Sequence, residues 1–143
     1  MVTVHATCVA FEGRGVLIRG PSGSGKSDLG LRAIDAGARL VADDRVTLAS
    51  RGDTIVASAP ASIRGMIEIR GLGIVRLDAL EEAALSLVVD LVERTAVERL
   101  PERRHCDLME TPIAWMGLAG FDASAVAKLR FALAALEPGR LVT

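Results

Sequence analysis

The sequence contains few aromatic residues and no tyrosine. In 143 residues there are only three Phe and one Trp. Proteins that bind single-stranded nucleic acid stack successive bases on aromatic side chains, so this composition argues against such a platform. The net charge of −1 also excludes a general basic field that would attract DNA or RNA. We therefore expect no nucleic-acid partner.

Cysteine and long apolar runs are scarce as well. Cys8 and Cys106 lie far apart and form no metal-spaced cluster, and no signal peptide is visible, so we expect two free thiols in a cytoplasmic protein. The apolar run 85–92 contains Asp90 and is too short to span a membrane, so we expect no membrane partner. The length of 143 residues predicts a single domain, residues 1–143, with a sizeable core.

One glycine-rich stretch matches the motif G-x-x-x-x-G-K-[ST] at every fixed position. Its residues are Gly20, Pro21, Ser22, Gly23, Ser24, Gly25, Lys26 and Ser27. Residues 15–19 before it are typical of a buried strand, and residues 27–36 after it of a helix, which is the context this motif requires. Because the chain has only two lysines, composition alone gives roughly two chance matches per thousand such chains.

The motif predicts a site for nucleotide phosphates. Its glycines let successive backbone N–H groups face inward at the start of a helix, which forms an anion-binding nest. Lys26 would reach the β- and γ-phosphates of ATP, and the Ser27 hydroxyl would ligate Mg²⁺. The alternative is a Gly/Ser turn that precedes a helix by chance. We favour phosphate binding.

Carboxylates follow the motif at two places. The apolar run 39–42 ends in Asp43 and Asp44, which would serve Mg²⁺ or the nucleophile, or else cap a turn. Glu68 and Arg70 share one face of a predicted strand, either as an exposed edge pair or close to a ligand. His5 lies in the first predicted strand, where a lone histidine is more often structural than catalytic.

The remaining pattern predicts a mixture of strands and helices. Residues 2–11 and 15–19 suggest a hairpin, and residues 85–92 and 111–116 further strands. A helix is expected from residue 123 to about 136, with Asp122 as its N-cap. The run 93–104 mixes both charges, as a solvated face does.

Three stretches resemble the C-terminal catalytic domain of HPr kinase/phosphorylase. They are residues 4–5 with the glycine-rich motif, residues 39–46, and residues 66–74, which resemble the signature of that family. The resemblance implies an α/β fold: a P-loop kinase domain with a mixed β-sheet, similar to the phosphoenolpyruvate-carboxykinase-like branch. It also implies that ATP and Mg²⁺ are used to phosphorylate a serine of HPr, the phosphocarrier protein of the sugar phosphotransferase system. The family can reverse this reaction by phosphorolysis.

The resemblance also implies residue roles. His5 would be an active-site histidine, and Lys26 with the rest of the motif would hold the phosphates. Ser27 and Glu68 would bind Mg²⁺.

The same resemblance implies a base and a positive charge for the reaction. The pair Asp43–Asp44 would contain the base that accepts the proton of the target serine, and we favour Asp44. Arg99 would stabilise charge on the transferred phosphoryl group.

The sequence departs from the family where the family has a basic loop linked to dephosphorylation. Residues 112–117, in that region, contain no Arg or Lys. We therefore expect kinase activity more than phosphorylase activity. By the same resemblance, we expect the chain to begin at the catalytic domain, without the N-terminal domain of full-length relatives. A homo-oligomer is implied by resemblance alone, because the family forms hexamers. One rival function is a small-molecule kinase or GTPase, but the guanine-reading N-K-x-D motif of GTPases is not present. The other rival is a nucleotide-sensing module without phosphoryl transfer.

Overall fold

The computed structural model describes residues 1–142. Its strands are β1 (Val2–His5), β2 (Thr7–Phe11), β3 (Arg14–Arg19), β4 (Arg39–Ala42), β5 (Arg45–Arg51), β6 (Thr54–Ser58), β7 (Met66–Ile69), β8 (Gly73–Arg76), β9 (Glu82–Leu91), β10 (Arg104–Leu108) and β11 (Thr111–Leu118). Its helices are α1 (Lys26–Asp35) and α2 (Ala125–Ala134), with short 3₁₀ turns at Ala61–Ile63 and Arg94–Ala96.

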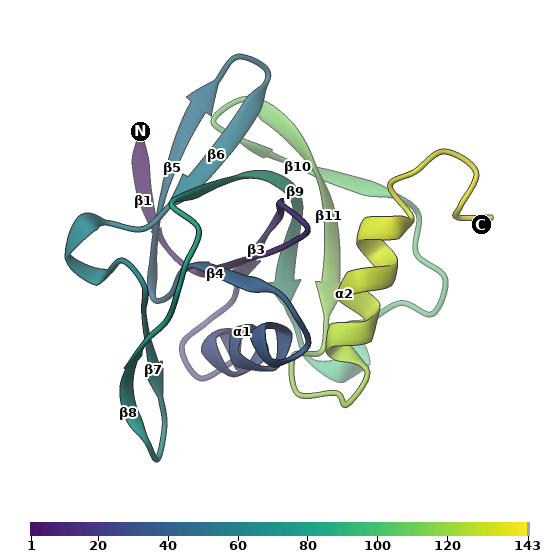
Figure 1. The fold of residues 1–143 in the computed structure, drawn as a ribbon. Coiled ribbons are helices and arrows are strands. Elements are labelled where there is room, and N and C mark those ends of the chain that lie inside the picture. Colours follow the sequence, from purple (N-terminus) through teal and green to yellow (C-terminus); the bar gives the residue numbers. More distant parts are fainter. Residues whose placement is uncertain (143) are drawn as a thin grey trace.

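Nine of these strands form one mixed, strongly curled sheet (Figure 1). Its main path runs β1-β5-β6-β9-β3-β2-β4, and β11 joins β9 and carries β10. The start of β9 pairs with β6 antiparallel, whereas its later residues pair parallel with both β3 and β11. The ten-residue strand β9 therefore connects the antiparallel part of the sheet, β1-β5-β6, to the part that contains β3 and β11, and this accounts for the curl.

Side chains pack on both faces of the central strands. Leu17 and Val88 point into a core enclosed by the curl, whereas Ile18 and Val89, one position further along, pack beneath the two helices. Alternation along each strand sends neighbouring residues to opposite faces, so apolar residues at successive positions fill both cores. This explains why β3 and β9 appear in the sequence as continuous apolar runs.

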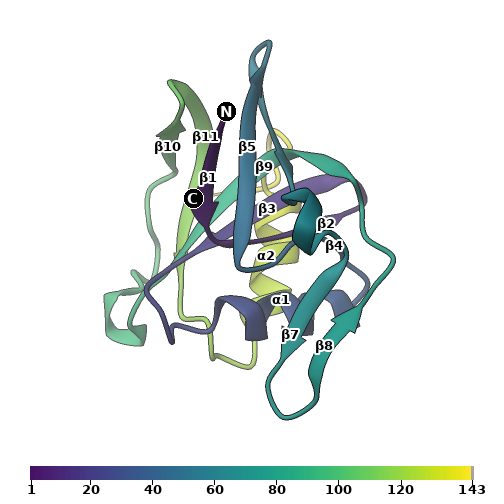
Figure 2. The ribbon, with the colours of Figure 1, turned by 90° about the vertical axis from the view of Figure 1, so that its left-hand side faces the viewer.

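The parallel arrangement of β3, β9 and β11 gathers functional loops at one edge. Their carboxyl ends point the same way, so the glycine-rich loop after β3 and the segment after β11 lie at the same edge. The β7–β8 hairpin forms a separate two-stranded sheet that projects from the body, and β7 contacts α1 (Figures 1 and 2).

Most predicted elements are confirmed, with three corrections. The predicted first strand is broken at Ala6, so β2 forms the hairpin with β3 while β1 pairs with β5. Strand β10 was not predicted, because its sequence contains both charges and exposed positions. The N-cap of α2 is Ser124 rather than Asp122, since the backbone carbonyl of Asp122 already closes a turn with the Ala125 N–H.

The strand predicted at residues 111–116 is confirmed as β11, which contains the residues 112–117 that were compared with a basic loop of the family. Residues 112–115 pair with β10, and residues 115–117 pair with β9. Among residues 1–142, no helix is long and apolar enough to cross a membrane.

Candidate nucleotide-binding and catalytic site

The glycine-rich loop, residues 20–27, connects β3 to the start of α1, as its motif predicts. Gly23 and Gly25 have φ angles of 83° and 99°, the left-handed region that glycine enters without a steric penalty. Gly25 is the N-cap of α1 and has no side chain to cap the first N–H groups. The loop therefore directs free backbone donors at the start of a helix, where an anion is stabilised.

Lys26 folds back over this loop. Its Nζ donates hydrogen bonds to the carbonyl oxygens of Gly20, at 2.7 Å, and Pro21, at 3.2 Å. The ammonium group thus lies at the centre of the loop, on the side that lines a cavity. A cation at this point can neutralise charge on an oxyanion held by the loop.

The two adjacent aspartates take different positions. Asp43 is 5% exposed, and its Oδ1 accepts hydrogen bonds from the Ser27 hydroxyl at 2.7 Å and the Thr7 hydroxyl at 3.0 Å. These contacts join the end of β4 to the starts of α1 and β2. Asp43 therefore belongs to a buried network behind the loop.

Asp44 instead faces the cavity. Its φ of 69° lies in the left-handed region, which aspartate tolerates better than most residues. A tight turn causes this geometry, because the Arg45 N–H donates to the Asp43 carbonyl and the Ala6 N–H donates to the Asp44 carbonyl. The side chain is exposed and free of the Ser27 network, as a group that exchanges a proton with a substrate must be.

A cavity of about 510 Å³ contains most of the predicted site residues. Its walls are Thr7, Ser22, Gly23, Gly25, Lys26, Ser27, Asp28, Leu31, Asp44, Glu68, Ile69, Arg70 and Phe121. Glu68 lies on β7 and Arg70 directly follows it, so the projecting hairpin supplies one charge of each sign. The hairpin therefore contributes to the wall of the cavity.

His5 and Arg99 lie outside this cavity wall. His5 is exposed at the end of β1 and pairs with Arg45, beside the turn that carries Asp44. Arg99 is exposed in the segment that leads from β9 to β10. The cavity thus unites the loop, Asp44 and Glu68, whereas the roles of His5 and Arg99 stay predictions.

Sequence analysis did not identify Thr7, Arg32 or Phe121. Thr7 is fully buried and supplies the second hydroxyl to Asp43. Arg32 donates to the backbone carbonyls of Gly120 and Asp122, which fixes the segment after β11 against α1. The only signal for Thr7 was a polar residue in an otherwise apolar strand; the other two depend on tertiary contacts that no local pattern reports.

A charged pair supports the strand that leads into the loop. Arg19 and Asp90 form two hydrogen bonds of 2.8 Å, and the Trp115 indole N–H donates to Asp90 at 2.7 Å. Burial alone would raise the pKa of Asp90, but the hydrogen bonds from Arg19 and Trp115 and the charge of Arg19 hold it below its usual value. Asp90 therefore remains ionised and fixes Arg19 next to Gly20.

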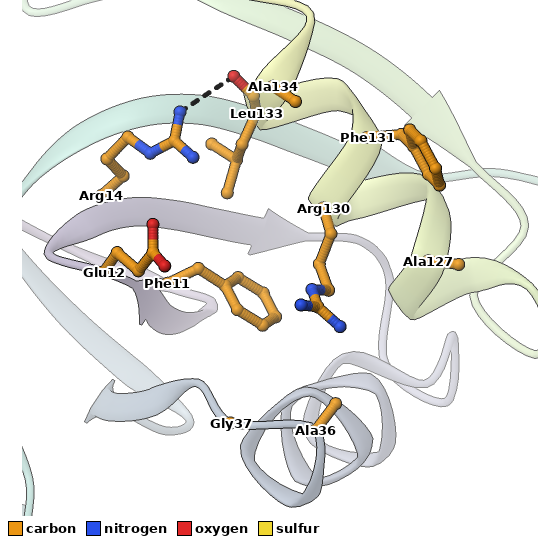
Figure 3. A pocket seen from close by; sticks show the side chains of 10 residues that line it. All are labelled: Phe11, Glu12, Arg14, Ala36, Gly37, Ala127, Arg130, Phe131, Leu133 and Ala134. Atoms are coloured by element: carbon orange, nitrogen blue, oxygen red, sulfur yellow. Dashed lines mark hydrogen bonds between the residues drawn. The ribbon is translucent and has the colours of Figure 1, made fainter.

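A larger cavity, of about 590 Å³, lies elsewhere (Figure 3). It separates the β2–β3 turn from α2, with the Arg130 guanidinium 5.9 Å from the centre of the Phe11 ring. Arg14 donates to the Leu133 carbonyl at 3.0 Å and closes one end. None of the predicted site residues lines it, so volume alone does not identify the functional site.

The residues present fit a magnesium ion held partly by substrate. Mg²⁺ is usually bound by one or two carboxylates together with phosphate oxygens and water. The Ser27 hydroxyl and the Glu68 carboxylate supply oxygens of this kind at the cavity. Within residues 1–142 no group of three or more His, Cys, Asp or Glu is arranged to hold a metal ion.

The fold and the cavity define the class of the protein: a mixed α/β domain with a curled sheet and a glycine-rich loop at the start of its first helix. The family model described as the HPr Serine kinase C-terminal domain matches residues 1–118. The chain therefore belongs to the HPr kinase C-terminal domain family.

Individual relatives agree with this assignment. The HPr kinase/phosphorylase of Cupriavidus metallidurans is 39% identical over 123 residues, which cover 78% of this chain and 38% of that protein. The HPr kinase/phosphorylase of Geobacillus kaustophilus is 47% identical over 96 residues, 62% of this chain and 31% of that protein. This chain thus spans less than two-fifths of the length of these curated relatives.

A solved structure shows the same fold. The HPr(Ser) kinase/phosphatase from Coxiella burnetii superimposes with a TM-score of 0.81 at 24% sequence identity, and the match covers 95% of this chain and 90% of that one. At this identity the likeness concerns the fold.

Proposed function

We propose that this chain is a single catalytic domain that transfers the γ-phosphoryl group of ATP to a serine of HPr or of an HPr-like phosphocarrier protein, in the regulation of sugar uptake or carbon metabolism. We also place it in the phosphoenolpyruvate-carboxykinase-like branch of P-loop kinases. The observation that carries the proposal is the convergence of Lys26, Asp44 and Glu68 on the cavity at the glycine-rich loop. Membership of the HPr kinase C-terminal domain family supports the choice of HPr as the proposed substrate.

The proposed chemistry follows from the position of each group. The backbone N–H groups of the loop and Lys26 would bind the phosphates and offset their charge, which is the main requirement for phosphoryl transfer. Asp44, exposed at the cavity, would accept the proton of the serine hydroxyl as it attacks.

His5, next to the turn that carries Asp44, and Arg99 are proposed to assist, as in the family. A bound Mg²⁺ would supply further charge neutralisation, with Ser27 and Glu68 as its protein oxygens.

We propose kinase activity before phosphorolysis, because residues 112–117, compared with the basic loop of the family, contain no Arg or Lys to bind inorganic phosphate. A homo-oligomer, such as a hexamer, stays part of the proposal. The test is incubation of the protein with Mg²⁺, γ-labelled ATP and HPr from the same cell. Acid-stable label on a serine of HPr is expected, and addition of phosphate then tests reversal.

The matched variants are Lys26→Ala and Lys128→Ala, which remove the only two lysines of the chain in turn. Lys26→Ala is expected to lower the transfer rate by about 100-fold or more, as loss of a group that stabilises transition-state charge does. Lys128, on α2, lies outside the cavity wall, so its removal is expected to leave transfer unchanged. Wild-type rates in Lys26→Ala would contradict the proposal. ATP binding without transfer to any acceptor would favour the nucleotide-sensing module instead. Transfer of the phosphoryl group to a small molecule would favour the small-molecule kinase.

A further inference from the structure

A nucleotide carries a base as well as phosphates, and one aromatic side chain lies at the rim of the glycine-rich loop. Phe121, in the segment after β11, lines the same cavity as Lys26 and Glu68. Its side chain is 68% exposed. A single exposed Phe is ordinary on a protein surface, so its position has to carry the argument.

The backbone that presents Phe121 is held firmly. Arg32 of α1 donates to the carbonyl oxygens on either side of it, those of Gly120 and Asp122, and Asp28 in turn binds Arg32 at 2.9 Å. Gly120 packs so closely that a Cβ there would lie 3.1 Å from the Ser24 carbonyl oxygen. The segment is therefore fixed against both the loop and α1.

The ring itself rests on the loop. A Cβ at Gly25 would lie only 2.8 Å from the Cζ atom of Phe121, so the ring packs closely over this glycine. One side of the ring therefore packs against the loop, while Phe121 lines the cavity and stays largely exposed. An aromatic ring held in this way loses little conformational freedom when a flat ligand packs against it.

Phe121 and the carboxylates lie on opposite flanks of the loop. In the sheet, β4 and its Asp43–Asp44 turn lie on one side of β3, and β11 lies on the other (Figure 2). Glu68 joins the carboxylate flank through the β7–β8 hairpin, which packs on α1. A nucleotide that lies across the loop with its terminal phosphate toward the carboxylates therefore has its base on the Phe121 flank.

We propose that Phe121 stacks on the purine base of bound ATP and so supplies the affinity that distinguishes a nucleotide from bare polyphosphate. This inference rests on the proposed function, because it requires that the loop binds a nucleotide. Base–aromatic stacking contributes measurably to affinity and does not depend on the groups at the edge of the base. Scarce aromatics are no obstacle, since one ring suffices for one base.

The test is calorimetric titration of the wild-type protein, Phe121→Ala and Phe121→Trp with Mg·ATP and with Mg·tripolyphosphate. Phe121→Ala is expected to weaken ATP binding about tenfold, within the range of single stacking contacts. It should leave tripolyphosphate binding unchanged, and Phe121→Trp should retain ATP binding. Phe131→Ala is the matched control, because Phe131 is 77% exposed but lines the other cavity.

Three results would overturn the inference and leave nucleotide binding intact. The first is unchanged ATP affinity in Phe121→Ala. The second is equal weakening of ATP and tripolyphosphate binding, which would mean that the ring only shapes the loop. The third is a raised KM for HPr alone in the transfer assay, which would mean that the ring contacts the protein substrate. Failure of the wild-type protein to bind either ligand would overturn the proposed function as well.

Discussion

At the scale of single residues, the main finding is that two neighbouring carboxylates have separate environments. The sequence could identify the pair but could not distinguish its members, since the difference arises from a turn and from hydroxyls on two other elements. Asp43 accepts two hydrogen bonds in a buried position, whereas Asp44 projects from a left-handed turn into the cavity. Stability and chemistry are thus expected to depend on different members of the pair.

Asp44→Asn is expected to lower phosphoryl transfer by about 10²–10⁴-fold, the usual contribution of a general base, and to leave ATP affinity and melting temperature nearly unchanged. Asparagine tolerates the left-handed backbone there. Asp43→Ala is expected to lower the free energy of unfolding by about 1–3 kcal/mol, because it leaves two hydroxyls without their acceptor. Urea denaturation and a transfer assay measure both effects; a reversed outcome would move the base to Asp43.

At the scale of elements, the close packing of α1 on β2 positions the site. Gly30 is buried in the middle of α1, and a Cβ there would lie 2.8 Å from the Cγ2 atom of Thr7. The Thr7 hydroxyl donates a hydrogen bond to Asp43, so a shift of α1 against β2 would also move the Asp43–Asp44 turn. The sequence predicted both elements, but a glycine in a helix gave no indication that it marks a contact.

Gly30→Ala tests this connection. In an exposed helix the change stabilises by about 1 kcal/mol, but here it is expected to destabilise by about 1–3 kcal/mol through overpacking and to reduce transfer. Thr7→Ser removes the obstructing methyl group and keeps the hydroxyl, so the double variant should recover most of the loss. Thermal unfolding of the single and double variants measures it, and full stability in Gly30→Ala alone would show that α1 shifts freely.

At the scale of the whole molecule, a buried thiol and a paired carboxylate make stability depend on pH at both ends of the range. Burial raises the pKa of Cys8 to about 12, whereas Asp90 has a lowered pKa. The folded protein therefore keeps the Cys8 proton after the unfolded chain has lost it near pH 9. Between pH 9 and about pH 12 the folded state binds more protons than the unfolded state, so the free energy of unfolding falls as pH rises. The contribution of Asp90 is present above its unfolded pKa and is lost as pH falls through its folded value.

The free energy of unfolding is accordingly expected to decline from about pH 9 upward, since free cysteine has a pKa near this value. The chain has no tyrosine, so phenol ionisation adds nothing to this decline. Urea titrations at pH 7 to 11 measure the slope. Cys8→Ala should flatten it, and Cys106→Ala, which removes a half-buried thiol, should do so far less. An equal slope in wild type and Cys8→Ala would contradict the assignment.

The sequence predicted the class of fold because the apolar runs and the glycine-rich motif are local signals. It did not predict that β9 would connect the two parts of the sheet, or that β10 exists, because strand pairing depends on partners far along the chain. For the candidate site, the charged residues were found from motifs. Thr7 and Phe121 were not found, because their positions depend on how β2 and the segment after β11 pack against α1.

The hydrogen bond between Trp115 and Asp90 has a spectroscopic consequence. The chain contains one tryptophan, and its indole N–H contacts a carboxylate that also binds Arg19, the residue next to the glycine-rich loop. A change in the loop that shifts Arg19 will alter the electric field at the indole. The single tryptophan is therefore connected through Asp90 and Arg19 to the strand that leads into the candidate site, so we expect its emission to follow ligand binding without any label.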